Sequence, residues 1–261
     1  MLGTNNDDSM KFVEYGEGPT VVLLLPKSSS SVEAQQLVDH LAKSHRVIIL
    51  DWRSCHQAQD SKNVYSLDIL ITGLCEFVCR LNLKTVDVLC HSTGCGLGIG
   101  LAARDPHLVS RLCLAAPWTH GDPYLRMIQN LRVKAATLMG EKAYDELNSL
   151  ILFSPNSVMQ QLIEAKNSSL DSPQQQLDVK EIVGRINAIL DFDARPLLSK
   201  IKSKTLVMAA RDDLLMPPQY SKRIVEGIAD ACYREFDAGG HMFPITQAEC
   251  FADEVLKFLD A

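Results

Sequence analysis

Short apolar runs recur along the chain and alternate with longer stretches in which apolar residues follow a helical spacing. The runs are almost continuously apolar, which is typical of strands buried on both faces of a parallel sheet. They are TVVLLL (20–25), RVIIL (46–50), TVDVLC (85–90), RLCLAA (111–116) and KTLVMAA (204–210). Their alternation with helices predicts an α/β fold with a mostly parallel central sheet and helices on both faces.

Further elements flank this pattern. KFVEYG (11–16) is typical of an antiparallel edge strand, and CYREFD (232–237) of a late strand. We expect one helix to start at Ser66, whose hydroxyl is a suitable N-cap, and an amphipathic helix near the end, over 247–259.

Residues 119–195 interrupt the alternation, because four consecutive stretches there have helical spacing. The stretches are DPYLRMIQNLRVKAATLMG, EKAYDELNSLILF, PNSVMQQLIEAKNS and DVKEIVGRINAIL. A helical block inside an alternating chain predicts a cap over 119–195, inserted above the carboxyl edge of the sheet. The core is then expected to comprise 1–118 and 196–261.

Composition narrows the function classes. The chain has 261 residues, 46% hydrophobic and 22% charged, with a net charge of −6. This is an ordinary globular balance without the basic surface that nucleic acid requires. No apolar run approaches the roughly 20 residues of a membrane span, and the polar first ten residues do not resemble a signal peptide. We therefore expect a cytoplasmic protein that acts on a small molecule, as a monomer or a homodimer.

The cysteines are expected to be reduced thiols rather than a disulfide framework, because no secretion signal accompanies them. There are eight. Cys75 and Cys79 share one helix face, and without a CxxC pair or a histidine cluster we interpret them as small buried hydrophobic residues. No metal and no cofactor are expected.

The stretch LCHSTGCGLG (89–98) places Ser92 between an apolar strand and a helix that begins near Thr93. A strand–turn–helix of this kind is the context of a nucleophile elbow, in which the residues two positions from the serine must be small. Gly94 meets this need on one side. Cys90 stands where a glycine is usual on the other.

A matching acid and base follow the serine in the order Ser, Asp, His that such elbows require. VMAARDDLLMPP ends a strand with two aspartates, and DAGGHMFPI places His241 in a glycine-flanked loop. Asp213 is the preferred acid and Asp212 the alternative. Each residue alone also has a structural interpretation, since Ser92 could merely form a turn and Asp213 merely cap a helix.

On these motifs the chain resembles the α/β-hydrolase superfamily over nearly its full length. Within it, the chain is similar to the aminoacrylate hydrolases of pyrimidine utilisation and to 3-oxoadipate enol-lactonases, in residues 184–218 and 237–259 and in LILFSPNSV (150–158). The resemblance implies Ser92 as nucleophile, Asp213 as acid and His241 as base.

Two segments depart from that pattern. Leu25-Pro26 replaces a usual His-Gly, and matching the backbone assigns the oxyanion-hole N–H groups to Lys27 and Thr93. In DWRSCHQAQD (51–60) the usual glycines are replaced by Ser54 and His56. His56 and Cys55 are candidates to face the substrate.

Other pocket candidates are less specific. Trp118 either lines the pocket or packs the cap onto the sheet. A carboxylate of a small acidic substrate could be bound by a cap arginine, although most arginines on amphipathic helices are solvated. The cap arginines are Arg126, Arg132, Arg185 and Arg195.

The leading hypothesis is thus a serine hydrolase that cleaves a small ester, lactone, amide or enamine-type substrate. Two alternatives stay open. A cofactor-independent dioxygenase of a heteroaromatic substrate shares the fold, but its acid follows the strand after the elbow helix, where the first carboxylate here is Asp122. A non-catalytic binding protein on the same fold is the other.

Overall fold

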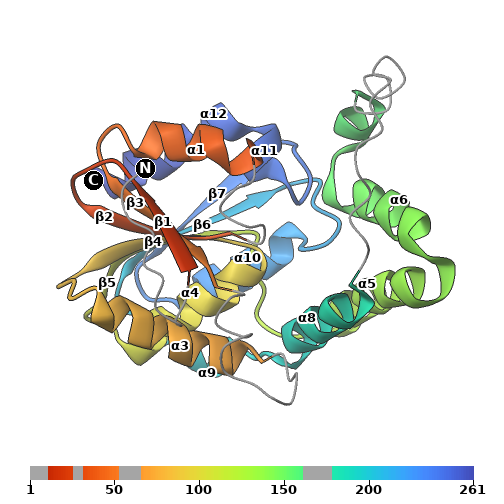
Figure 1. The fold of residues 1–261 in the computed structure, drawn as a ribbon, viewed down its shortest axis with the longest axis horizontal. Coiled ribbons are helices and arrows are strands. Elements are labelled where there is room, and N and C mark those ends of the chain that lie inside the picture. The colour runs from red at the N-terminus through yellow and green to blue at the C-terminus, as the bar shows by residue number, and fades with distance from the viewer. Residues whose placement is uncertain (1–10, 26–31, 53–65, 161–177) are drawn as a thin grey trace.

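A seven-stranded sheet forms the centre of the computed structural model, which describes residues 11–25, 32–52, 66–160 and 178–261 (Figure 1). The strand order is β1-β3-β2-β4-β5-β6-β7, and every pair is parallel except β1 with β3. The predicted parallel sheet and its antiparallel edge strand are therefore confirmed. The strands are β1 (Lys11–Tyr15), β2 (Thr20–Leu24), β3 (Arg46–Asp51), β4 (Val86–His91), β5 (Val109–Ala115), β6 (Lys204–Ala210) and β7 (Ala231–Phe236).

Helices cover both faces of the sheet, as the sequence predicts (Figure 1). This is why the central strand β4 is buried along its whole length and carries no polar alternation. One face is covered by α1 (Val32–Leu41) and α12 (Ala248–Leu259), and the other by α3 (Leu67–Arg80), α4 (Thr93–Arg104) and α10 (Pro218–Gly227). Ser66 occupies the N-cap position of α3, but its side chain makes no capping hydrogen bond, which corrects that part of the prediction.

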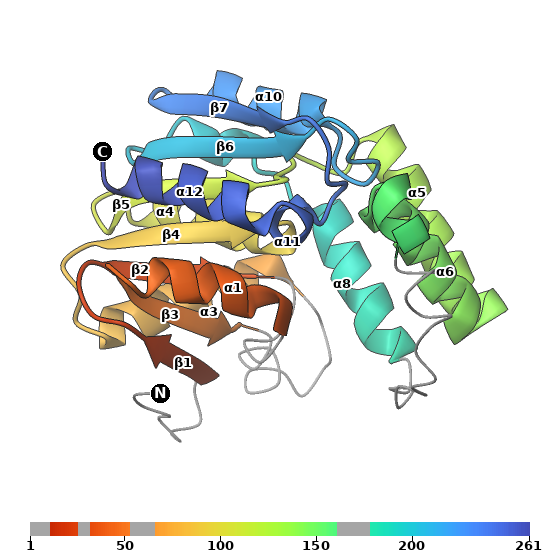
Figure 2. The ribbon, with the colours of Figure 1, turned by 90° about the horizontal axis from the view of Figure 1, so that it is seen from above.

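The helices of the middle segment lie beyond the carboxyl ends of the strands (Figure 2). We call α5 (Pro123–Lys134), the π-helix η1 (Ala135–Met139), α6 (Glu141–Leu152) and α8 (Val179–Asp191) the outer helices. The chain enters and leaves them through neighbouring connections, since the backbone N–H of Ala194 donates to the Thr119 carbonyl over 2.7 Å and His120 forms a β-bridge with Asp193. Two further short helices are α9 (Arg195–Leu198) and α11 (Phe243–Thr246).

The cysteines divide between the core and the surface. Cys90, Cys95 and Cys113 are buried. Cys79 is exposed and Cys75 only partly buried, so the prediction that this pair is buried is wrong. The buried face of α3 is centred on other positions, Leu70, Ile71, Leu74 and Val78, and the two cysteines lie at its margin.

Among the described residues, no helix is long and apolar enough to cross a bilayer.

Candidate active site

Ser92 stands at the sharp turn between β4 and α4, where the elbow is predicted. Its φ of 53° and ψ of −122° are unusual for a residue with a side chain. Backbone hydrogen bonds hold it there, from its own N–H to the Ala115 carbonyl (2.9 Å) and from the Cys95 N–H to its carbonyl (2.8 Å). Such backbone strain costs about 1–3 kcal/mol and persists only where the surroundings enforce it. The turn projects the hydroxyl beyond the end of the sheet.

The small residues around Ser92 have separate steric reasons. A Cβ on Gly94 would overlap the Leu24 carbonyl oxygen on the neighbouring strand β2, so no side chain fits there. Cys90 occupies the other position because Gly98, in the second turn of α4, leaves room for its thiol: a Cβ on Gly98 would overlap Cys90 Sγ. The departure at Cys90 is therefore accommodated by tertiary packing, and the elbow is intact.

Three side chains from distant parts of the chain meet at this turn. Ser92 Oγ lies 2.8 Å from His241 Nε2, and His241 Nδ1 lies 2.8 Å from Asp213 Oδ2. All three residues are buried, with 7%, 2% and 3% of their surfaces exposed for Ser92, His241 and Asp213. A hydroxyl, an imidazole and a carboxylate in this sequence can move a proton away from the serine and stabilise the resulting imidazolium.

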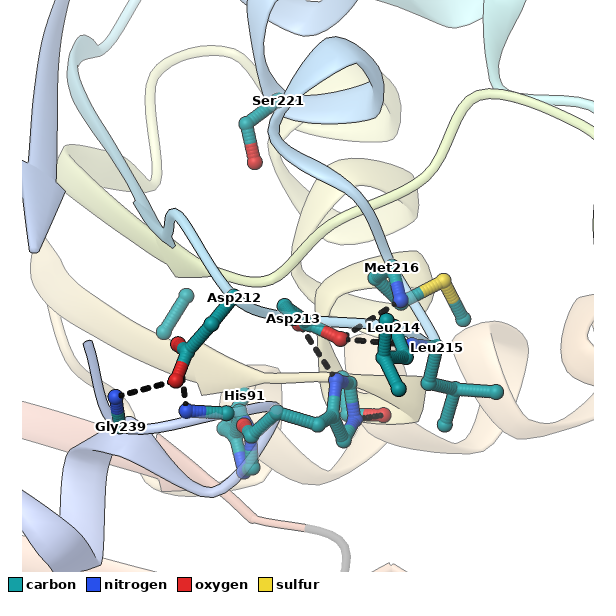
Figure 3. Close-up of polar contacts among 12 residues, drawn as sticks. His91, Asp212, Asp213, Leu214, Leu215, Met216, Ser221 and Gly239 are labelled. Atoms are coloured by element: carbon teal, nitrogen blue, oxygen red, sulfur yellow. Dashed lines mark hydrogen bonds and ion pairs between the residues drawn. The ribbon is translucent and has the colours of Figure 1, made fainter. Parts of the chain in front are cut away.

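The two adjacent aspartates are distinguished by their partners (Figure 3). Besides facing the histidine ring, the Asp213 carboxylate accepts hydrogen bonds from the backbone N–H groups of Leu215 and Met216, both over 2.8 Å. Asp212 instead accepts from the backbone of Gly239 (3.3 Å) and Gly240 (2.8 Å), in the loop that carries the histidine. The structure therefore pairs Asp213 with the imidazole and uses Asp212 to hold the loop.

His91, which the sequence analysis did not single out, is a further part of the site. Its Nε2 lies 2.9 Å from the backbone carbonyl of His241, and the two rings are 5.1 Å apart. Burial, and secondarily the nearby charge of His241, lowers the pKa of His91 to about 3, so its ring is neutral near neutral pH. Because a carbonyl only accepts, Nε2 carries the proton. The signal in the sequence that could have pointed to His91 is its position immediately before Ser92.

The remaining pocket candidates have different outcomes. Lys27, His56 and their neighbours Pro26 and Cys55 lie outside the described residues. Thr93 is the first residue of α4, where backbone N–H groups have no partner within the helix.

Trp118 is fully buried, and its contacts match the packing alternative. Its indole N–H donates to the Ile189 carbonyl over 3.1 Å, and its ring packs edge-on against Phe192 at 5.7 Å. The residue therefore joins α8 to the core.

The cap arginines do not share one environment. Arg126 donates to the Leu190 carbonyl over 3.0 Å, and Arg195 is exposed and paired with Asp193 over 2.6 Å. Arg185 is partly buried on α8, and Arg132 is buried. Arg132 therefore differs from the solvated arginines that are expected on an amphipathic helix.

Asp122, the acid that a dioxygenase would require, makes its hydrogen bonds to groups other than His241. It caps α5 by accepting from the Leu125 N–H (2.9 Å), and it binds Tyr220 (2.5 Å) and Arg223 (3.1 Å) on α10. The imidazole of His241 faces Asp213 instead.

Comparisons with known proteins agree with the fold. Residues 19–248 match the α/β-hydrolase fold family. A protein of Rhizobium rhizogenes named as a carbamate hydrolase, RutD, is 27% identical over 94% of each chain. The crystal structure of MGS-M2, an α/β-hydrolase enzyme from a Medee basin deep-sea metagenome, superposes with a TM-score of 0.85 at 18% identity, over 99% of this chain and 98% of the other. An enol-lactonase from Burkholderia xenovorans superposes with a TM-score of 0.77 at 21% identity, over 97% of each.

Proposed function

The chain belongs to the α/β-hydrolase fold family and is a hydrolase, and from this premise we propose that it cleaves small ester, lactone, amide, carbamate or enamine-type substrates with a serine nucleophile. The observation that carries the proposal is the pair of 2.8 Å contacts that join Ser92 to His241 and His241 to Asp213. The carbamate hydrolase and enol-lactonase names of the relatives support the range of substrates.

In the proposed reaction on an ester, lactone, amide or carbamate, His241 Nε2 accepts the hydroxyl proton as Ser92 Oγ attacks the carbonyl carbon. The imidazolium then gives that proton to the leaving oxygen or nitrogen, and the bond to the leaving group breaks. A water molecule, deprotonated by His241, then attacks the acyl-enzyme. The bond to Ser92 Oγ breaks, the acid leaves, and the imidazolium returns its proton to Ser92 Oγ. Asp213 stays ionised throughout, holds the ring in one orientation and stabilises its positive form.

The negative oxygen of the tetrahedral intermediate requires hydrogen-bond donors. We assign one to the backbone N–H of Thr93, because it is the first of α4 and helix N-termini carry positive partial charge. The second is assigned to the backbone N–H of Lys27, which lies outside the described residues. Each such donor stabilises the transition state by about 3–4 kcal/mol.

The outer helices act in this proposal as a cap that encloses the substrate over residues 119–195. Their connection to the site is direct: the backbone N–H of Met242, next to His241, donates to the carbonyl of Leu152 at the end of α6 over 3.0 Å. Gly240 also lies so close to the backbone of 152–154 that a Cβ there would collide with it. The catalytic loop and the end of α6 therefore support each other.

The test compares Ser92→Ala with a control serine, Ser110→Ala, which is exposed on β5. With p-nitrophenyl acetate as substrate, we expect Ser92→Ala to lower kcat/KM by about four orders of magnitude and Ser110→Ala to leave it unchanged. A fluorophosphonate should label the wild type and the control but not Ser92→Ala. Full turnover by Ser92→Ala would refute the nucleophile assignment, and oxygen consumption by that variant would favour the dioxygenase alternative.

A further inference from the structure

Where α5, α6 and α8 meet, the outer helices enclose an arginine. Arg132 on α5 has only 7% of its surface exposed. Its Nε donates to Asn148 Oδ1 (2.9 Å), Nη1 to Gln129 Oε1 (2.9 Å) and Nη2 to the Tyr144 hydroxyl (3.4 Å). The guanidinium carbon also lies 5.9 Å from the centre of the Tyr144 ring. All of these partners are neutral.

The charge of Arg132 is therefore not balanced by any carboxylate among the described residues. Arginine does not lose its proton in proteins, so the charge persists despite burial. A buried charge without a counterion is strongly unfavourable. Burial lowers the pKa of Arg132; Tyr144 opposes this effect, and the like charge of Arg185 on α8 adds to it. Arg185 is thus a second cation near Arg132.

Hydrogen-bond donors also outnumber acceptors in this cluster. Gln129 is fully buried, and its amide Nε2 has no hydrogen-bond partner among the described residues. The amide cannot be turned to remedy this, because its oxygen already accepts from Arg132. Native proteins seldom leave such a group unpaired, and one that is unpaired points to a missing acceptor. The cluster lacks both a negative charge and an acceptor, and one carboxylate supplies both.

The cluster is linked to the triad through α6. Asn148 lies one helical turn before Leu152, a separation of about 6 Å along the axis. The Leu152 carbonyl in turn accepts from Met242, the neighbour of His241. The arginine cluster and the loop that carries His241 therefore contact the same helix, α6.

We propose that Arg132, with Gln129 and Arg185, binds a carboxylate at the end of the substrate remote from the bond that Ser92 attacks. The substrate class is then a small acid that carries a second, hydrolysable acyl group, such as a monoester or monoamide of a dicarboxylic acid. This inference rests on the proposed function. It assigns the selectivity for charge to α5 and α8 rather than to the elbow.

The test measures binding in the Ser92→Ala protein, which cannot consume its ligand by the proposed route. Monomethyl glutarate is compared with the neutral dimethyl glutarate by calorimetry. We expect the charged monoester to bind at least tenfold more tightly. Adding Arg132→Gln should abolish this preference, whereas Arg195→Gln, which removes an exposed charge already paired with Asp193, should preserve it. Equal binding of both esters, or a preference that survives Arg132→Gln, would overturn the proposal.

A second variant keeps the test decisive if Arg132→Gln does not fold. Gln129→Glu has the same shape, still accepts from Arg132 and replaces the unpaired amide by a carboxylate oxygen. We expect a higher melting temperature and loss of the preference for the monoester, because the internal carboxylate takes the place of the ligand's. The proposal would be overturned if Gln129→Glu kept the preference for the monoester. It would also be overturned if inorganic phosphate displaced the monoester as effectively as glutarate does.

The two proposals fail separately. If Ser92 is not the nucleophile, the turnover assay shows it while the charge preference in binding persists. If the carboxylate site is wrong, wild-type turnover of p-nitrophenyl acetate is unaffected and the binding preference is absent.

Discussion

The packing of Cys90 against Gly98 behind the elbow leads to a quantitative prediction. In the native protein the thiol occupies the space that a side chain at position 98 would need. The substitution Gly98→Ala therefore forces a methyl group into the buried Sγ. In a Cys90→Ala background the same methyl group meets Leu112 Cδ1 at 3.4 Å and the Cβ at position 90 at 3.7 Å, both ordinary van der Waals distances.

The magnitudes follow from two opposing effects. Overpacking a core costs about 1–3 kcal/mol, whereas replacing a helical glycine by alanine stabilises by about 1 kcal/mol. Gly98→Ala alone should thus lower the free energy of unfolding by up to about 2 kcal/mol. Combined with Cys90→Ala it should instead raise this free energy relative to Cys90→Ala alone. Cys90→Ala itself removes one buried sulfur and costs about 1 kcal/mol. The coupling is then about 1–3 kcal/mol.

Guanidinium unfolding followed by tryptophan fluorescence measures all four corners of this double-mutant cycle, since Trp52 and Trp118 are both buried. The m-values should stay equal, which shows that the denatured state is unchanged. Turnover of p-nitrophenyl acetate is a second readout, because the strain falls directly behind Ser92. If Gly98→Ala has the same effect in both backgrounds, within about 0.5 kcal/mol, the steric explanation of Cys90 is wrong.

Three further predictions concern the residues around His241. Asp213→Asn should lower turnover by about 10⁴-fold near neutral pH with an unchanged circular dichroism spectrum, because the amide favours the wrong tautomer of the ring. Asp212→Ala should reduce the free energy of unfolding by about 1–3 kcal/mol in urea titrations, because two backbone N–H groups of the loop lose their acceptor; an unchanged midpoint would contradict this. The pKa of His91 falls from 6.5 to about 3 on folding, so only the unfolded ring takes up a proton over most of this range. Stability should therefore fall as the pH drops below about 6.5, and urea unfolding of His91→Gln across this range should show a shallower decline.

Much of the candidate site could be predicted because its signals are local. Ser92 follows an apolar strand and precedes a helix, and the turn between them has few backbone solutions. The carboxyl ends of parallel strands meet at one edge of a sheet, so residues after β4, β6 and β7 were expected to converge. Asp213 and His241 follow the last two of these strands.

Other features depend on neighbours that the local pattern does not reveal. Asp212 and Asp213 are adjacent and chemically identical, and only the path of the chain after β6 directs one carboxylate to the ring and the other to the loop. Cys79 has the spacing of a buried residue, yet the face of α3 that packs is rotated away from it. Arg132 resembles any solvated helix arginine until three helices enclose it.

The sequence by itself thus determined the order of strands and helices, the elbow and the candidate triad, because each follows from backbone preferences and hydrophobic periodicity within a short window. Only the tertiary structure decided which aspartate faces the imidazole, why a cysteine fits behind the serine, and that a cation is buried among the outer helices. The physical reason is the separation of the interacting residues along the chain. These outcomes depend on close packing and unscreened charge between residues that are distant in sequence; Ser92 and His241, for example, lie 149 positions apart.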